Sequence, residues 1–420
     1  MLKVLIFVLS LLQICFCEKL YNKYKVYDIR VKNENQLLKL KNLDTFEGEA
    51  RELDFLSLHN NVNDVVKLVV KPEEQNYIED FFKLNSLDFK IVSENIQDVI
   101  DKERDEVSML SKRKSDVITF DRYYRYEDIN KYLDNLANSY PDNVKVKTAG
   151  KSFEGRDIKY ITITNGDGKS KNSIFIDGGI HAREWIAPAA ALYIINQLVD
   201  SQSTFSKLLD KVDFVIQPLV NPDGYEFTHN FYRLWRKTRS RSSAFQCRGS
   251  DANRNYDFHW SEVGASNNAC AETYHGPTAF SENESQISRD IIDEVKGNCK
   301  FFLTFHSYGN YLIYPNGYTK DLPENWMDNE EVAQAGAEAI SKATGTKYTV
   351  GSTSNVLYLA SGSSTDYALG VGKIPIAICM ELTGGGYFGF DLPASEIEKT
   401  VKETLIGVEA MVETVARKYN

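Results

Sequence analysis

The chain has 420 residues, of which 42% are hydrophobic, 12% aromatic and 26% charged. This length allows two or three domains with buried cores, and the composition excludes disordered, collagen-like and multi-span membrane chains. The 59 acidic residues outnumber the 49 basic ones, so the net charge of -10 provides no general attraction for phosphate backbones. We therefore expect neither a nucleic-acid nor a membrane partner.

The N-terminus has the layout of a secretory signal peptide over residues 1–17. Lys3 is followed by the apolar run 4–12, and the chain turns polar at Glu18. A membrane span would need about 20 apolar residues, and a buried N-terminal helix seldom combines one charge with so short an apolar stretch. The sequence therefore predicts a secreted, extracellular protein, in an oxidising environment where disulfides persist.

Residues 18–114 carry almost no motif chemistry and are predicted to fold as a small α/β sandwich of their own. Strand-like runs alternate with helical patterns, over 25–31, 34–43, 65–70, 72–84 and 89–92. A charge-dense, helix-like segment over 101–114 then ends in Ser111-Lys-Arg-Lys-Ser115, a basic sequence that a trypsin-like protease would cut. A solvated linker is the alternative, but in a secreted chain we expect an activation pro-domain that covers the functional site.

From residue 115 to 420, strands, helices and Gly-rich turns alternate, which predicts an α/β domain whose mixed central sheet carries helices on both faces. In such sheets functional groups gather where strands end. A Gly-Gly pair breaks the strand-like run 172–177, and His181 and Glu184 follow before the helical stretch 185–199. This spacing can place an imidazole and a carboxylate on one metal ion.

A third metal ligand is expected at His306, which ends the strand-like run 300–305. Together with His181 and Glu184 it leaves a fourth position open, which is the pattern of a catalytic rather than a structural zinc ion. We expect one zinc ion per chain. The other four histidines do not follow apolar strands and are interpreted as surface or structural residues: His59, His229, His259 and His275.

Four cysteines remain once the signal peptide is removed, and they allow three disulfide pairings. Cys247 and Cys270 both lie in the polar, loop-like stretch 240–271, and we expect them to form a disulfide. Cys299 and Cys379 border or lie within apolar, strand-like runs, where a free thiol behaves as a small hydrophobic side chain. A second bridge between them is the alternative.

Six motifs follow one another along the large domain: His181-Ala-Arg-Glu-Trp185, Arg233-Leu-Trp-Arg-Lys-Thr-Arg239, Asp251-Ala-Asn-Arg-Asn255, His306-Ser-Tyr308, Tyr358 before Ala360-Ser-Gly, and Glu381. In this order and with these gaps they resemble the zinc metallocarboxypeptidases of the pancreatic A/B type. The resemblance covers residues 115–420, and the preceding domain, basic junction and signal peptide fit a procarboxypeptidase. It implies a zymogen, activated by a trypsin-like protease, that hydrolyses the C-terminal peptide bond of peptides and proteins. We expect a monomer.

The resemblance also implies how the substrate is bound. Asn253 and Arg254 would bind its free carboxylate, because a guanidinium can bind a carboxylate bidentately, and Tyr358 would add a hydroxyl from a mobile loop. Arg236 resembles the residue that stabilises the negative charge growing on the scissile carbonyl oxygen. Arg183 would contact the substrate further from its C-terminus.

Two carboxylates complete the implied machinery. Asp251 resembles the carboxylate that orients a zinc-bound imidazole, which we expect to be His181. Glu381, at the end of the apolar run 374–380, would take a proton from the attacking water and pass it to the leaving amine. A non-catalytic binding protein on the same fold is the alternative, but the presence of all three ligands and Glu381 favours an enzyme.

Thr365 determines the expected substrate preference. The resemblance places Thr365 where B-type enzymes carry an acidic residue and A-type enzymes an apolar one, and it implies that the adjacent Asp366 points elsewhere. A substrate cation buried there would lack a counter-charge, whereas an apolar side chain would gain from burial. We therefore expect A-type activity on aromatic and aliphatic C-terminal residues, with B-type removal of C-terminal Lys or Arg as the alternative.

Overall fold

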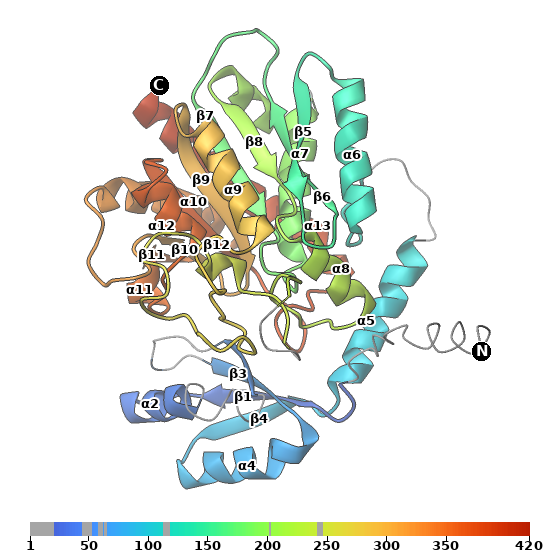
Figure 1. Cartoon of the computed structure of the whole chain (residues 1–420), viewed down its shortest axis with the longest axis vertical. Helices are drawn as coiled ribbons and strands as arrows, with labels where there is room; N and C mark the ends of the chain where they lie inside the picture. The colour runs from blue at the N-terminus through green and yellow to red at the C-terminus, as the bar shows by residue number, and fades with distance from the viewer. Residues whose placement is uncertain are drawn as a thin grey trace, which may run out of the picture.

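A computed structural model of the chain describes residues 21–43, 53–57, 62, 65–111, 118–200, 203–241 and 247–420. Figure 1 shows a small unit at the bottom and a larger unit above it, linked through helix α5 (Ile96–Ser111). The expected signal peptide over 1–17, His59 and the basic residues 112–114 lie outside the described residues.

The small unit contains β1 (Lys25–Arg30), α2 (Glu34–Asn42), β2 (Asp54–Ser57), β3 (Val65–Val70), α4 (Gln75–Leu84) and β4 (Asp88–Ser93). Its strands form an antiparallel sheet in the order β2-β3-β1-β4. Helices α2 and α4 lie on one face of this sheet, where Leu40 and Phe82 pack against Tyr27 and Leu68. The expected small α/β sandwich is therefore confirmed.

Three local features of the small unit differ from the pattern in the sequence. Strand β2 is not predicted, because four residues are too few to show an alternating pattern. Pro72 begins a separate 3-10 turn, η3 (Pro72–Glu74), before α4. Helix α5 begins at Ile96 rather than at residue 101, since Ile96 and Ile100 are buried in the contact with the large unit.

The large unit contains α6 (Tyr126–Ser139), β5 (Val144–Lys151), β6 (Asp157–Ile163), β7 (Ser173–Gly178), α7 (Ile186–Val199), β8 (Asp213–Gln217), α8 (Pro222–Asn230), α9 (Asn283–Val295), β9 (Cys299–Ser307), β10 (Tyr311–Tyr314), α10 (Trp326–Thr344), β11 (Thr349–Ser352), α11 (Thr353–Val356), α12 (Ser364–Gly370), β12 (Ile376–Leu382) and α13 (Ala394–Tyr419). The described strands form one sheet in the order β11-β10-β12-β9-β7-β8-β6-β5. The central strands β12, β9, β7 and β8 pair in parallel, and antiparallel pairs flank them on both sides.

Helices cover both faces of the large sheet. On one face α6, α7, α10 and α13 pack together, and Ile194, Val332 and Val408 belong to that core. On the other face α9 and α12 contribute Ile291 and Ala368 to a second core. This arrangement confirms the expected mixed α/β sheet with helices on both faces, and it leaves the strand ends free to carry functional side chains.

The face of the small sheet opposite its helices packs on the large unit. Val26 and Leu56 of the small unit and Ile96 of α5 form a buried cluster with Leu234 and Phe390 of the large unit. Because these side chains are apolar and nearly inaccessible, their burial stabilises the docked arrangement of the two units.

A buried ion pair holds α5 against the large unit. Arg233 donates from Nε to Glu103 Oε2 at 2.5 Å and from Nη2 to Glu103 Oε1 at 3.0 Å. The same guanidinium donates to the carbonyl oxygens of Arg183 and Phe390 and lies 3.7 Å from the centroid of the Trp185 ring. Glu103 is therefore a counter-charge for an arginine whose side chain has 0% of its surface exposed.

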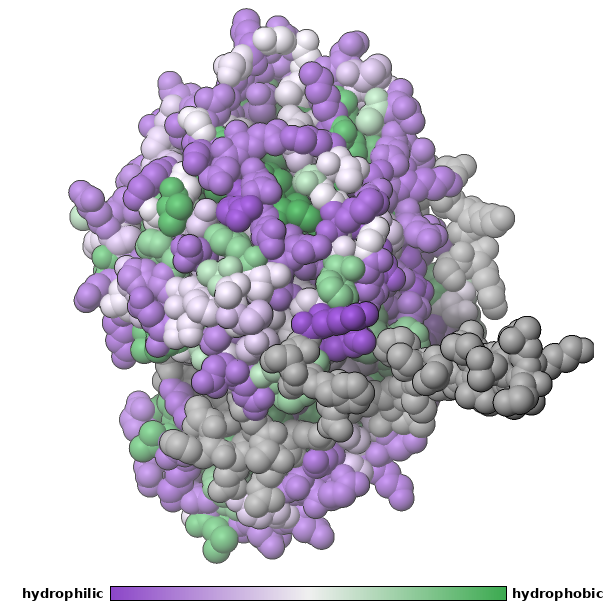
Figure 2. Space-filling view, viewed as in Figure 1, coloured by the Kyte–Doolittle hydropathy of each residue, from purple (hydrophilic) through white to green (hydrophobic). Residues whose placement is uncertain are grey.

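The face of the molecule displayed in Figure 2 is mainly polar. Figure 2 shows hydrophilic side chains over most of the displayed face, with hydrophobic ones scattered between them. Within the described part of the chain, no helix combines the length and the apolar character that crossing a membrane requires.

Replacing Glu103 by Gln should weaken the docking of the small unit, because it leaves the buried Arg233 guanidinium without a counter-charge. Removing one partner of a buried ion pair costs about 3 kcal/mol or more. Limited proteolysis and thermal unfolding of the full chain would measure the effect as faster digestion of residues 21–111 and a lower unfolding temperature. Asp105→Asn, which changes an exposed residue of the same helix, is the control. Identical behaviour of the two variants would contradict the role given to this ion pair.

Candidate metal centre and active site

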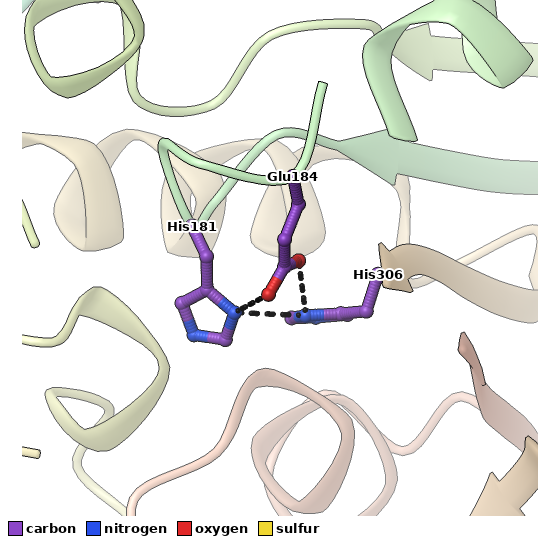
Figure 3. A group of neighbouring side chains, drawn as sticks. All are labelled: His181, Glu184 and His306. Carbon is purple, nitrogen blue, oxygen red and sulfur yellow. Dashed lines mark hydrogen bonds and ion pairs between the residues drawn. The ribbon is translucent and has the colours of Figure 1, made fainter. Parts of the chain in front are cut away.

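The ends of two neighbouring parallel strands deliver the three predicted metal ligands. After β7 the chain turns at Gly179, whose φ of +71° and close approach to Leu219 and Pro188 leave no room for a side chain. The turn leads into the loop that carries His181 and Glu184 ahead of α7. His306 lies near the end of β9, which pairs in parallel with β7. Figure 3 shows the three side chains pointing toward one another.

The ligand atoms lie at the spacing that a tetrahedral metal ion requires. His181 Nδ1 is 2.8 Å from Glu184 Oε1, and His306 Nδ1 is 3.1 Å from His181 Nδ1 and 3.2 Å from Glu184 Oε2. A tetrahedral zinc ion with ligands at about 2.0–2.1 Å keeps pairs of ligand atoms about 3.3 Å apart. Two imidazoles and one carboxylate are also the donor set of catalytic zinc, so these residues fit the ion.

Burial and neighbouring charges set the protonation of the ligands. Burial lowers the pKa of His181, and the Arg236 guanidinium lowers it further, so the ring is neutral at neutral pH. Burial alone would raise the pKa of Glu184, but the His181 and His306 rings hold it below its ordinary value. Burial would lower the pKa of His306, but the Glu184 carboxylate raises it above its ordinary value. Neutral imidazole and ionised carboxylate are the forms that bind a metal ion, so metal binding requires His306 to be neutral.

Asp251 connects the metal site to Arg236. Its Oδ1 lies 3.2 Å from His181 Nε2, and its Oδ2 accepts from Arg236 Nε at 3.0 Å and Nη2 at 2.8 Å. Burial would raise the pKa of Asp251, but Arg236 and His181 hold it well below the ordinary value. When His181 donates from Nε2 to this carboxylate, its Nδ1 keeps the lone pair that faces the other ligands.

Glu381 lies beside the three ligands on strand β12. The parallel register of β12 and β9 places it directly opposite His306. Ligand atoms of His306, Cys379 and Glu381 lie within 4.8 Å of one another. Burial raises the pKa of Glu381 to about 7, with the Glu184 carboxylate acting in the same direction. A carboxylate with such a pKa can both accept and release a proton at neutral pH.

A cavity of about 1630 Å³ is lined by both units and contains the metal-site residues. Segment 53–57 of the small unit forms part of its wall, so the small unit lies over the site as expected. Asp251 is fully buried behind the wall. Beside the three ligands, the predicted site residues on the wall are Arg183, Arg236, Asn253, Arg254, Tyr358, Thr365 and Glu381.

The cationic side chains of the cavity are held by neighbouring oxygens. Arg254 donates to the carbonyl oxygens of Gly264 and Asn253, both at 3.0 Å. The ring of Tyr358, which is 37% exposed, has its centroid 5.8 Å from the Arg254 guanidinium carbon. Arg183 donates from Nη1 to Asp54 Oδ2 of the small unit at 3.3 Å. The small unit therefore supplies an anionic partner inside the cavity.

The cavity wall includes a set of uncharged residues around Thr365, which we call the neutral pocket. Thr365 is 5% exposed there, and the adjacent Asp366 turns away, because both of its oxygens accept from the Gly317 amide at 3.0 and 3.1 Å. Burial raises the pKa of Asp366 to about 7. The neutral pocket consists of Ile313, Thr353, Leu357, Ala360, Ser363, Thr365 and Cys379.

Three cavity residues were not predicted as site residues from the sequence. Asp54 Oδ2 and Glu272 Oε2 both approach Arg183 Nη1, at 3.3 and 3.7 Å. No local pattern marks them, since both depend on contacts between distant segments. Cys379 precedes Glu381 by two residues on one strand and so shares its face, a spacing that the sequence does contain.

The other predicted histidines and cysteines lie outside the metal group. His229 is half-buried and stacks on Trp185, with ring centroids 3.9 Å apart, and His259 stacks on Tyr318 at 3.6 Å. His275 lines the cavity, where its Nε2 is 3.1 Å from Ser261 Oγ. The expected disulfide and the two expected free thiols are both present: Cys247–Cys270, and Cys299 and Cys379, which are buried.

Replacing His306 by Ala should abolish metal binding, because two ligands do not hold zinc in a site of this kind. Atomic absorption of the dialysed protein would report the zinc content per chain, with less than a tenth of the unmodified value expected. His259→Ala is the matched control, since that ring stacks on Tyr318 away from the three ligands. Full zinc content in the His306 variant would show that the metal is bound elsewhere.

Comparison with known proteins shows which family models and relatives the chain matches. A family model described as zinc carboxypeptidase matches residues 129–407, and one described as carboxypeptidase activation peptide matches residues 27–103. The protein named carboxypeptidase B of Astacus astacus is 45% identical over 299 residues, which cover 71% of this chain and 98% of that protein. Zinc carboxypeptidase A 1 of Drosophila melanogaster is 38% identical over 94% of this chain and 92% of its own length.

The solved structures agree with the sequence matches. The crystal structure of carboxypeptidase A from Helicoverpa armigera superimposes with a TM-score of 0.87, at 31% identity, over 95% of this chain and 99% of that one. Both units of the fold are therefore present in a carboxypeptidase. The chain belongs to the zinc carboxypeptidase family, and it carries the family's activation peptide ahead of the peptidase domain.

Proposed function

We propose that the activated protein removes neutral aromatic or aliphatic residues from the C-termini of peptides and proteins. The observation that carries this proposal is the presence, in one cavity, of a zinc-type ligand set, Glu381 and the neutral pocket. The ligands assigned to zinc are His181, Glu184 and His306. The cavity wall also contains Arg254, which supplies the guanidinium that recognition of a free carboxylate requires.

We assign residues 1–17 to a signal peptide, 18–114 to the activation domain and 115–420 to the catalytic domain. Helix α5 ends at Ser111, directly before the basic residues where a trypsin-like protease would cut. The disulfide Cys247–Cys270 supports secretion, because disulfides persist in oxidising compartments. Removal of the activation domain would take Asp54 and the rest of segment 53–57 out of the cavity, and a monomer would then accept substrate.

Substrate binding is assigned to residues on the cavity wall. Arg254, Asn253 and Tyr358 would hold the C-terminal carboxylate, with the exposed Tyr358 side chain free to close over it. Arg183, once free of Asp54, would contact the substrate further from its C-terminus. These contacts fix the scissile bond next to the metal ligands, which lowers the barrier by orientation.

The hydrolytic step needs a proton carrier and a site for negative charge. Zinc, when bound, supplies the Lewis acidity that activates a water molecule and polarises the scissile carbonyl. Glu381 would accept the proton of the attacking water and deliver it to the leaving amine. Arg236, oriented by Asp251, would stabilise the negative charge on the carbonyl oxygen, a contribution of roughly 3 to 4 kcal/mol for one such donor in other hydrolases.

The neutral pocket supports A-type specificity. Thr365 offers a hydroxyl but no charge, and Ile313, Leu357 and Cys379 form one apolar cluster. An aromatic or aliphatic side chain buried there gains about 1.5 to 3 kcal/mol from leaving water. A lysine or arginine side chain would instead lose hydration without meeting a carboxylate in the pocket.

Removal of C-terminal Lys or Arg is the second candidate. It is favoured by the 45% identity to a protein named carboxypeptidase B. The acidic group available to it is Glu272, which lines the cavity and lies 3.7 Å from Arg183. Under this alternative Glu272→Gln would abolish turnover of basic substrates, whereas A-type activity on neutral substrates does not depend on that residue.

Replacing Glu381 by Gln should reduce kcat about 10²- to 10⁴-fold, because the amide cannot carry the proton, while zinc content stays unchanged. The trypsin-activated enzyme would be assayed on a peptide with a C-terminal Phe, with and without a chelator. The unmodified enzyme should lose its activity in the chelator. Turnover by the Glu381 variant at the unmodified rate would remove this residue from the mechanism.

Thr365→Asp should convert the preference toward basic C-terminal residues, since a carboxylate in the neutral pocket supplies the missing counter-charge. We expect kcat/KM to fall at least tenfold for peptides ending in Phe or Leu and to rise for those ending in Lys or Arg. Thr365→Val, which has nearly the same shape, should keep the neutral preference. A preference of the unmodified enzyme for Lys or Arg would contradict A-type specificity.

A further inference from the structure

A row of buried polar side chains crosses the sheet behind the metal site. The parallel register pairs Asp177 of β7 with Gln217 of β8 and with Thr304 of β9. His306 follows Thr304 by two residues, so its side chain lies on the same face of the sheet. These four side chains are exposed by no more than 1%.

The polar atoms of this row have unmet hydrogen-bonding capacity. Among the described residues, none accepts from Gln217 Nε2 or His306 Nε2, pairs with Thr304 Oγ1, or donates to either carboxylate oxygen of Asp177. Burial raises the pKa of the nearby Tyr256, and the Asp177 charge raises it further. Several hydrogen-bond donors and one group that can only accept, the Asp177 carboxylate, thus share one buried region. Buried groups of this kind are normally joined by internal water.

The metal site determines which nitrogen of His306 carries the proton. His306 Nδ1 faces His181 Nδ1 and Glu184 Oε2, so this nitrogen must be unprotonated when zinc is bound. The proton then lies on Nε2, which needs an acceptor. His181 has Asp251 for that purpose at 3.2 Å, whereas His306 has no such direct contact among the described residues.

Asp177 is a buried carboxylate that can serve as the acceptor for the His306 Nε2–H group. The register pairs Asp177 with Thr304, and His306 follows Thr304 by two residues on the same face of β9, so the Asp177 side chain lies on the face that carries both. Both of its oxygens are buried and accept from no described residue. A ligating imidazole usually donates its second N–H to a carboxylate, a carbonyl or a water, and such partners orient the ring.

We propose that Asp177 is a positioning residue for His306: His306 Nε2–H donates to a buried water shared with Thr304, the water donates to the Asp177 carboxylate, and this chain keeps the proton on Nε2 and Nδ1 directed at zinc. Asp177 touches neither the metal nor the substrate. It gives His306 the same kind of support that Asp251 gives His181. The inference rests on the assignment of His306 as a zinc ligand.

The test compares zinc affinity and metal-free stability in the full-length chain. Asp177→Asn keeps the size of the side chain but removes the charge, and it should weaken zinc binding 10- to 100-fold in a competition with a chelator. Thermal unfolding of the metal-free variant should be unchanged or shifted upward, since an unpaired buried carboxylate is removed. A purely structural role would instead lower that stability and leave the zinc dissociation constant unchanged.

Three further variants complete the test. Asp251→Asn should weaken zinc binding to a similar extent, through His181. Glu284→Gln changes another fully buried carboxylate without a described partner, on α9, and should leave zinc affinity unaltered. Thr304→Val removes the shared hydroxyl alone and should also weaken zinc binding, which keeps the inference testable if the Asp177 variant does not fold.

A zinc dissociation constant within twofold of the unmodified value in Asp177→Asn, or in Thr304→Val if only that variant folds, would overturn the inference. This result can be told apart from a failure of the proposed function. If His306→Ala keeps its zinc, the metal site itself is wrongly assigned. If His306→Ala loses zinc while Asp177→Asn retains normal affinity, only the role of Asp177 is rejected.

Discussion

The parallel pairing of β9 with both β7 and β12 is the constraint on which the site depends. Parallel neighbours end at the same edge of a sheet, so the turn after β7 and the end of β9 bring His181, Glu184 and His306 together. The register between β12 and β9 then sets Glu381 opposite His306. Ligands 125 residues apart in the chain therefore meet at one edge of the sheet.

The charges around the site compensate one another, which lowers the free-energy cost of burying them. Asp251 interacts with both His181 and Arg236, and the positive charge of Arg236 keeps it ionised although it is fully buried. Arg236 is thereby fixed in direction before any substrate arrives. A side chain held in this way loses little freedom on binding, which is how a preorganised site stabilises developing charge.

The activation domain uses the two faces of one small sheet for two purposes. Helices α2 and α4 cover one face and give the domain its own core, while the other face packs against the peptidase domain. Two ion pairs join the domains: Asp54 contacts Arg183 on the cavity wall, and Glu103 of α5 contacts the buried Arg233. An arginine of the cavity wall is therefore occupied by the activation domain before cleavage.

The sequence by itself determined the two-domain organisation, the strand ends that carry the metal site and the three ligands, because periodicity, strand-end position and short motifs are local properties of the chain. It did not reveal β2, whose four residues pair only through contacts with β3, or the ion pair between Glu103 and Arg233. The sequence also did not reveal that Asp177 lies behind His306. These features depend on the register and docking of segments far apart in sequence, and only the folded structure decides which side chains then share a buried space.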